Sequence, residues 1–466
     1  MATELDERPA AAWWESCGFV QIFRAFGMAL DWRKLILAAA GVVVTLVVAF
    51  VLDWIWLRAG HGVRPDALAT YAGVGNLADA PEAADARIGV FAAFWAFERD
   101  CVHGALASAR RGNVLGAAGV GGELFVSYPA GLATLGIVPN FVKGLTGVKW
   151  LLAKNVGYSL IFVPLALLIW SAVGGAVCRI AAVQFARNER LSPKQALLYA
   201  REKLWQGFFA APVIPLIGLL ILAGLLALGG LFLSIPYVGD LVGGLLFVLA
   251  IFVGFAIAFT LIGTIAGFNL LWPTVAAEGS DSFDAVSRSF SYVYQRPFRL
   301  LFYSFVAIIF GSICYAIVRL FVGVALASTH AAVNAGTIGT ALGEIWAMGG
   351  MYDLLGPTPT AISGGDVIAY GLIRFWVSLV VVLVWAFLAT YYFSASTIIY
   401  FLLRQAVDAT DLEDVYIDTY DEDAEPPSIT PTATPAPSTS LPVLNAAPAA
   451  ASGASDPPPS PESESR

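Results

Sequence analysis

Residues 208–271 decide the fold: FFAAPVIPLIGLLILAGLLALGGLFLSIPYVGDLVGGLLFVLAIFVGFAIAFTLIGTIAGFNLL, a stretch with a single charged residue, Asp240. A hydrocarbon core about 30 Å thick needs roughly 20 apolar residues in a helix. The stretch therefore predicts two membrane spans, Phe208–Leu233 and Val242–Leu271, joined by a turn without Lys or Arg. Four other runs meet the same criterion, so six spans are predicted; the others are Leu35–Leu57, Gly157–Val183, Leu300–Leu326 and Val367–Phe393, which continues as a helix to about Arg404.

The composition supports a membrane protein over a soluble one. Hydrophobic residues make up 58% of the chain, charged residues only 13%, and the mean hydropathy is +0.75. Soluble globular proteins carry about 25% charged residues. We therefore expect an all-α polytopic bundle of about six transmembrane helices with interfacial helices and an internal repeat.

The charge divides the chain into three parts. Residues 405–466 contain twelve Asp or Glu and one Arg, which gives this segment a net charge of −11. Because the net charge of the whole chain is −8, the remaining residues are basic overall. This Pro/Ala/Ser-rich segment lacks the apolar surface needed to fold, so a disordered acidic tail is predicted. An amphipathic N-terminal segment, 1–34, precedes the membrane domain, 35–404.

Lys and Arg in the connections predict the orientation. Cytoplasmic loops carry an excess of these residues. Arg24, Arg33 and Lys34 precede the first span, the connections after the second and fourth spans are basic, and Ser234–Leu241 and Ala327–Asp366 contain neither residue type. We expect both termini in the cytoplasm of a bacterium, at its inner membrane. The basic residues expected to face lipid are Arg187, Arg190, Lys194, Arg201, Lys203, Arg288, Arg296 and Arg299.

The segment 58–156 is expected on the external side. It contains an amphipathic helix candidate, RIGVFAAFWAFERDCVHGALASARR, residues 87–111. A Gly-rich apolar stretch follows from Val114 to Val138. That stretch is compatible with a re-entrant pair, an interfacial helix or an additional membrane hairpin, and the sequence leaves the three open.

Two cytoplasmic segments resemble each other. LSPKQALLYAREKLWQGFF from Leu191 aligns with SDSFDAVSRSFSYVYQRPF from Ser280 at an offset of 89 residues. Each copy begins with a Ser or Asp and an acid or amide three residues later, which is a helix-start signal. A third, partial copy is predicted to start at Thr410, and VQIFRAFGMALDWRKL before the first span matches the latter half of the unit. The sequence therefore predicts a duplicated unit of span, interfacial helix and span, with one further copy split between the chain ends.

The unit WPTVAAEGSDSFDAVSRSFSYVYQRPFRLLFY carries a resemblance to a known domain. Its apolar run is followed by a Pro, an acidic-Gly turn and a helix leading into the next span, at Pro273, Glu278, Gly279, Ala285, Arg288 and Ser289. This pattern resembles a membrane domain of prokaryotic families without assigned function, which also occurs fused to glycerophosphodiester phosphodiesterases. FARNERLSPKQAL and YFSASTIIYFLLRQAVDATDLEDVY look like an uncharacterised planctomycete-type family. The resemblance implies a fold and no activity.

Ionisable residues within spans are candidates for function, because each costs a few kcal/mol at the centre of a bilayer. Asp53, Arg319 and Arg374 lie in the outer parts of their spans, and Arg179 lies where it can extend to the cytoplasmic surface. Similar depth suggests that Asp53 neutralises one arginine. The other cation then either binds an anionic ligand or lipid headgroup, or extends to the surface without a functional role.

Glycine pairs occur in several of the predicted spans. Gly263 and Gly267, Gly174–Gly175 and Gly229–Gly230 allow close helix packing within the chain. No catalytic, cofactor-binding or metal-ligating motif appears, the cysteines form no CxxC pair, and the basic residues follow the membrane surface rather than a nucleic-acid footprint. We therefore expect membrane lipids as partners, with docking of a protein by the tail as a further role.

Two hypotheses of function remain from the sequence. The first is a non-enzymatic protein that organises or scaffolds the membrane through lipid contacts of its interfacial helices. The alternative is a transporter or permease for a small anionic solute, which the duplication, the prolines Pro212 and Pro215 and the intramembrane arginines would serve.

Overall fold

A computed structural model describes residues 18–74, 87–114, 135–336, 346, 354–355 and 366–417. Six of its helices are long and apolar enough to cross a membrane, as the sequence predicts. They are α3 (Trp32–Arg58), α8 (Val156–Arg187), α10 (Ala210–Leu233), α11 (Val238–Glu278), α13 (Pro297–Gly336) and α15 (Asp366–Asp408). The chain is thus an all-α polytopic membrane protein. The chain divides into two compact units, 1–427 and 428–466. The prediction of a disordered tail from residue 405 is wrong at its beginning, because residues 405–408 continue α15 and residues 409–417 are described with Val415 buried. Residues 418–466 lie outside the described residues.

Three of these helices are about twice the length that a bilayer requires. α11 has 41 residues, α13 has 40 and α15 has 43, whereas roughly 20 residues cross the hydrocarbon. The hydropathy of the sequence locates the part in lipid. Beyond it, α11 and α15 continue into ends that pack against other helices, whereas residues 331–336 at the end of α13 are exposed. The predicted spans are therefore correct in position but shorter than the helices.

The extended ends of α11 and α15 meet in one region, which we call the head and define as residues 18–34, 176–209, 270–300 and 393–417. It includes the short helices η1 (Gly18–Phe23), α2 (Arg24–Ala29), α9 (Pro193–Glu202), η3 (Leu204–Phe208) and α12 (Ser282–Gln295). Large side chains there are fully buried, among them Tyr199, Phe208, Tyr292 and Tyr400. The main hydrophobic core of the described chain is therefore located in the head.

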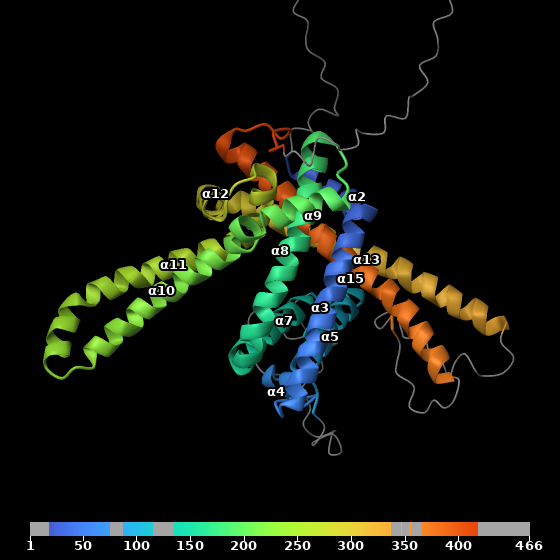
Figure 1. The fold of residues 1–466 in the computed structure, drawn as a ribbon, viewed down its shortest axis with the longest axis horizontal. Coiled ribbons are helices and arrows are strands. Elements are labelled where there is room, and N and C mark those ends of the chain that lie inside the picture. The colour runs from blue at the N-terminus through green and yellow to red at the C-terminus, as the bar shows by residue number, and fades with distance from the viewer. Residues whose placement is uncertain are drawn as a thin grey trace, which may run out of the picture. The chain divides into compact units, whose positions relative to one another are not determined.

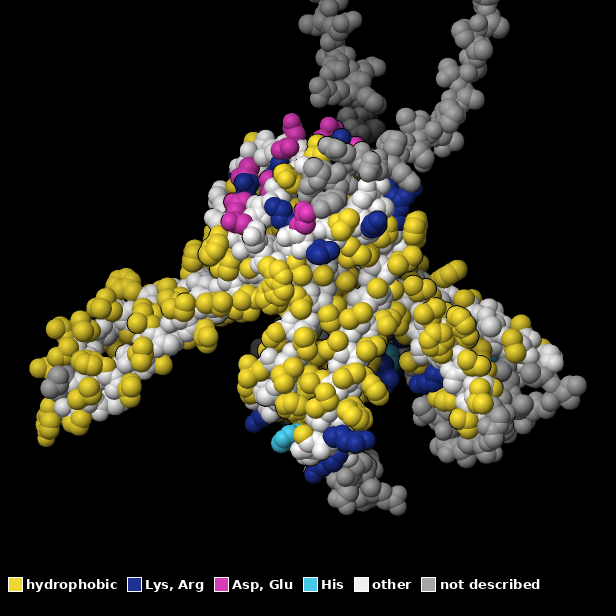
Figure 2. Space-filling model, in the orientation of Figure 1, with side chains coloured by type: hydrophobic (Ala, Val, Ile, Leu, Met, Phe, Trp, Pro, Cys, Tyr) yellow, Lys and Arg dark blue, Asp and Glu magenta, His cyan; other side chains and the backbone are white. Residues whose placement is uncertain are grey.

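Outside the head the spans pair as hairpins. α10 packs on α11, α3 on α8 and α13 on α15 (Figure 1). In α10 and α11 the most apolar windows are not buried at all by other parts of the described chain. Hydrophobic side chains cover this hairpin, whereas Lys, Arg, Asp and Glu gather over the head (Figure 2). A helix that is apolar all round is expected where lipid is the solvent.

A small outer layer covers the other ends of α3 and α8. It consists of α4 (Ala67–Tyr71), α5 (Val90–Arg110) and α7 (Ile137–Lys154). α5 confirms the amphipathic helix predicted within residues 87–111. α7 was not anticipated as a separate helix, and most of the stretch from Val114 to Val138, residues 115–134, lies outside the described residues. Trp150, Tyr158 and Phe162 belong to the core of this layer.

The helix ends in the head share a left-handed residue. Asn188 follows α8, Gly279 follows α11 and Ala409 follows α15, with φ of 56°, 64° and 54°. The next helices then begin with the predicted caps, because Ser192 accepts from the N–H of Gln195 and Asp281 from the N–H of Asp284. The helix expected at Thr410 is wrong: residues 409–417 contain a turn at Leu412 and Glu413 and no helix. We call residues 409–417 the strap.

Candidate functional site

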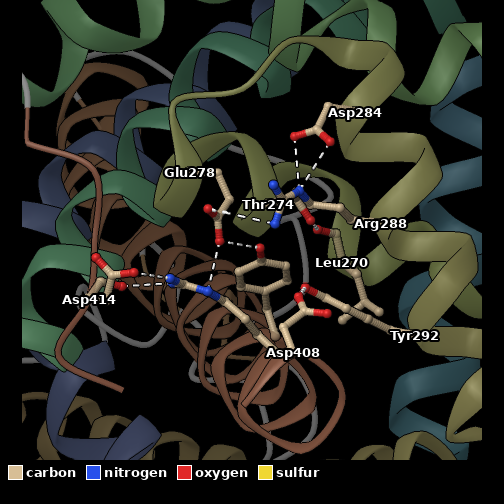
Figure 3. A network of polar contacts seen from close by, with 10 residues as sticks. Leu270, Thr274, Glu278, Asp284, Arg288, Tyr292, Asp408 and Asp414 are labelled. Atoms are coloured by element: carbon tan, nitrogen blue, oxygen red, sulfur yellow. Dashed lines mark hydrogen bonds and ion pairs between the residues drawn. The ribbon is translucent and has the colours of Figure 1, made fainter. Parts of the chain in front are cut away.

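Glu278, the last residue of α11, is the centre of a polar network in the head (Figure 3). Its Oε1 lies 2.9 Å from Nε of Arg404 and accepts a hydrogen bond of 2.8 Å from the Tyr400 hydroxyl. Its Oε2 lies 3.9 Å from the guanidinium of Arg288. Arg404 is only 4% exposed, so this carboxylate compensates a cation that is removed from water.

The strap closes over this network. Arg404 donates to the backbone carbonyl of Asp414 at 2.7 Å and forms an ion pair with its carboxylate at 2.6 Å. The backbone N–H of Tyr416 donates to the carbonyl of Ala277 at 2.8 Å. The strap is therefore bound to both α15 and α11, through one side chain and one backbone hydrogen bond.

The carbonyl groups at the end of α11 explain why these contacts occur. The last carbonyls of a helix have no partner within the helix and carry the negative end of its dipole. Here Tyr199 donates to Val275 at 2.8 Å, Arg179 to Ala276 at 2.6 Å and Lys203 to Gly279 at 2.7 Å. Together with the strap bond to Ala277, these contacts bring four donors to carbonyls at or next to this helix end: Arg179 of α8, Tyr199 of α9, Lys203 directly after α9, and the backbone of Tyr416 in the strap.

Arg179 links the strap to this helix end. It is fully buried, donates also to the carbonyl of Tyr416 at 2.6 Å, and lies 4.3 Å from the centre of the Tyr199 ring. The expected extension of Arg179 to the membrane surface is therefore wrong. Its guanidinium faces the interior because two backbone carbonyls and an aromatic face replace water around it.

Gly279 leaves space for this arrangement. Its left-handed backbone, φ 64°, ends α11. A Cβ built there would lie 2.5 Å from the ring of Tyr416. Both the backbone and the space require glycine.

Basic residues next to the first span also turn inward. Lys34 is fully buried and donates to the amide oxygen of Gln184 at 2.8 Å and to the Ser394 hydroxyl at 3.4 Å. Arg33 donates to the carbonyls of Arg190 and Leu191 at 2.9 and 3.3 Å. The beginning of α3 is thereby fixed to the connection after α8.

Two groups of α12 report on the charges of the network. Burial lowers the pKa of Arg288, but the carboxylates of Glu278 and Asp284 outweigh it and the pKa is raised overall. Burial, with the hydrogen bond that its hydroxyl donates to Asp408, raises the pKa of Tyr292. Both groups therefore keep their protons at physiological pH.

The predicted lipid-facing basic residues fall into two sets. Lys203 and Arg288 face the network, which corrects the expectation for them. Arg288 lies one helical turn from Asp284, whose carboxylate is 2.9 Å from its Nε, and Lys203 reaches the end of α11. The others are exposed on the head: Arg187, Arg190, Lys194, Arg201, Arg296 and Arg299.

The expected ion pair between Asp53 and an intramembrane arginine is wrong. The Asp53 carboxylate accepts hydrogen bonds of 2.9 Å from the backbone N–H groups of Phe91 and Ala92. It therefore caps the first turn of α5 and binds the outer layer to α3. The sequence could not show this partner, because backbone N–H groups carry no residue signature.

The two arginines are placed elsewhere. Arg319 is 6% exposed, donates to the Tyr315 hydroxyl at 3.0 Å and lies 3.3 Å from Nε2 of His103. Arg374 donates to the carbonyl of Leu355 at 3.2 Å. Arg319 thus connects α13 with α5, and Arg374 binds the connection before α15. Within the described residues no group of three His, Cys, Asp or Glu is placed to hold a metal ion.

Comparisons with protein-family models, with curated proteins and with solved structures give no match to this chain.

Proposed function

We propose that this protein is a non-enzymatic organiser of a bacterial cytoplasmic membrane, with the head at the level of the lipid headgroups on the cytoplasmic side. The observation that carries the proposal is the surface of the head. Large aromatic side chains are exposed there next to the apolar spans, namely Trp32 at 59%, Trp205 at 63%, Phe283 at 71% and Phe298 at 85%. Aromatic residues of this kind occupy the interface between membrane and water.

Basic side chains lie in the same region. Arg201, Arg296 and Arg299 are exposed within a few residues of those aromatic rings. An interfacial helix binds a membrane through apolar side chains in the lipid and Lys or Arg directed at anionic headgroups. The side chains of α9 and α12 and their flanks fit this description, and the basic residues favour the cytoplasmic leaflet for the head.

The internal repeat forms part of the proposal. α8–α9–α10 and α11–α12–α13 each consist of a span, a capped short helix and a span. We infer that α15, with α2 and α3, forms the third unit across the chain ends. The left-handed residues at Asn188, Gly279 and Ala409 support this inference. Such a repeat would place three similar lipid-binding edges around one head. The resemblance around Pro273 to the membrane domain described above is compatible with this and implies no activity.

The test uses the full chain in liposomes that contain labelled anionic lipid. We expect the protein to cluster that lipid, as measured by excimer fluorescence of a pyrene-labelled phosphatidylglycerol. A variant with Arg201→Gln and Arg296→Gln should lose most of the clustering. Arg64→Gln is the matched control, because Arg64 is exposed outside the head and forms an ion pair with Asp66 at 2.6 Å.

The same proteoliposomes also test the two alternative functions, transport and enzymatic turnover of lipid. Uptake of a small anion by the proteoliposomes would overturn the proposal in favour of a transporter, and turnover of lipid would overturn it in favour of an enzyme. Orientation is tested separately in cells with a cysteine at Ser287, which is exposed on α12. Labelling of that cysteine by a membrane-impermeant reagent added outside intact cells would place the head on the external side of the membrane and contradict the proposed orientation.

A further inference from the structure

A cavity of about 710 Å³ opens in the head between η1, the beginning of α13, the end of α15 and the strap. This volume lies in the range of small-molecule sites in proteins. The residues that line it come from all four segments and include Phe19 of η1, Phe298, Arg299 and Tyr303 of α13, Gln405 of α15 and Leu412 of the strap.

The polar groups of this cavity favour an anion. Arg299 is the one charged residue in the lining, which contains no Asp or Glu. Arg299, the Tyr303 hydroxyl and the Gln405 amide form no hydrogen bond or ion pair with another described residue. A guanidinium, a hydroxyl and an amide together can donate several hydrogen bonds to one phosphate group.

A second cavity in the head differs in that its lining contains acidic as well as basic side chains. It measures about 670 Å³ and is lined by Arg24 and Arg187 but also by Glu189 and Glu413. Arg187 there forms an ion pair with Glu189 at 2.9 Å. Arg187 of that cavity is compensated by Glu189, whereas no carboxylate among the described residues forms an ion pair with Arg299.

The wall of the first cavity is aromatic and continues into the membrane. The rings of Phe19 and Phe302 meet edge to face at 5.8 Å, and Phe298 is 85% exposed. Further along the same span, Leu301 is 72% and Phe305 is 60% exposed. A ligand with an anionic group in the cavity can therefore extend hydrocarbon chains along α13.

We propose that this cavity binds the headgroup of an anionic glycerophospholipid, with the phosphate on Arg299 and the acyl chains along α13. The inference rests on the proposed function in one respect, the placement of the head among the headgroups. It adds one defined lipid site to the general attraction of the basic surface.

The experiment is native mass spectrometry of the full chain in detergent, titrated with phosphatidylglycerol and, in separate samples, with phosphatidylcholine and with inorganic phosphate. We expect Arg299→Gln to weaken phosphatidylglycerol binding about tenfold, the value of a hydrogen bond to a charged group. Tyr303→Phe should weaken it by a smaller factor. Arg64→Gln is the control, since Arg64 is exposed, outside the head and absent from the lining.

Three results would overturn the proposal. They are an unchanged affinity in Arg299→Gln, an equal loss in Arg64→Gln, and binding of inorganic phosphate or phosphatidylcholine as tight as that of phosphatidylglycerol. Because Arg299 is exposed, the variant should melt at the temperature of the wild type, and a lower value would assign it a structural role instead. If lipid clustering fails while this site binds, the scaffolding proposal alone is refuted.

Discussion

The head and the α10–α11 hairpin are both helical, yet different interactions hold them. In the head, Arg179, Arg404 and Lys203 bind carbonyls and carboxylates at helix ends. The hairpin exposes Leu220 at 73% and Leu245 at 77%, and α10 and α11 pack on each other. In lipid such side chains gain nothing by leaving one apolar surface for another. The stability of the chain should therefore reside in the head.

A large loss of stability is expected from Arg179→Met. The substitution keeps a long side chain but leaves the carbonyls of Ala276 and Tyr416 without their donors, and a buried unsatisfied group costs roughly 1–3 kcal/mol each. We expect a loss of about 3 kcal/mol in the free energy of unfolding, measured by circular dichroism during a titration of detergent micelles with SDS. Arg201→Met, at an exposed position of the same head, should change it little. Equal losses in the two variants would contradict a special role for the buried arginine.

The same substitution in two regions sharpens the comparison. Gly279→Ala places a Cβ in a left-handed position and 2.5 Å from the Tyr416 ring, which costs about 1–2 kcal/mol for the backbone alone. Gly230 on α10 has nothing within 4 Å of a built Cβ, so Gly230→Ala should be neutral or slightly stabilising.

Limited proteolysis of the tail provides the readout. Gly279→Ala should release the strap and accelerate cleavage after residue 408, and Gly230→Ala should not. Accelerated cleavage in both variants would show that the strap responds to general loosening of the bundle rather than to the contact of Gly279 with Tyr416.

This contrast also explains what the sequence predicts and what it does not. Hydropathy locates all six spans because residues that face lipid must be apolar, and such runs are visible in the sequence. The α10–α11 hairpin is the clearest case. The head depends on donors that reach backbone carbonyls, such as Arg179 on Ala276, and no side-chain pattern encodes that partner. The caps at Ser192 and Asp281 are predicted correctly because cap and partner are three residues apart.

The small residues show the same division. Gly175 packs against the ring of Phe208 and Gly263 against that of Phe290, as close packing within the chain predicts. Gly229 and Gly230 have nothing within 4 Å of a built Cβ, so the packing expected for this pair is wrong. A glycine in an apolar run indicates that a close approach is possible, and only the arrangement of neighbouring helices decides whether it occurs.

In the head, buried charged groups have hydrogen-bond or ion-pair partners. Glu98, outside the head, is the opposite case, because its buried carboxylate oxygen has no such partner among the described residues. Glu98 on α5 faces α7, and a Cβ at Gly147 would lie 2.3 Å from its Oε1, an atom that is buried without a hydrogen-bond partner. Burial raises the pKa of Glu98 from the ordinary 4.5 to about 7. The folded state thus holds this proton more tightly than the unfolded state, so the stability of the outer layer falls as the pH rises from about 4.5 to about 7.

Cys101 on the same helix is the probe of that layer, because it is 4% exposed. In a Cys17→Ser background, we expect Glu98→Gln to slow maleimide labelling of Cys101 at pH 8 several-fold, since the amide removes the cost of the buried charge. The two proteins should label alike at pH 5, where Glu98 is protonated. A ratio independent of pH would show that Glu98 does not control the opening of α5 from α7.

The smallest effect is expected in the hairpin itself. Leu220→Ala removes a side chain that is 73% exposed in α10, so the loss of its contacts with lipid should cost less than about 0.5 kcal/mol. Leu403→Ala, at a fully buried position of the head, leaves a cavity and should cost about 2–5 kcal/mol. The same SDS titration measures both. If Leu220→Ala were as costly as Leu403→Ala, the hairpin would have a protein partner in the membrane, and the difference between the two regions would reflect a missing subunit rather than lipid.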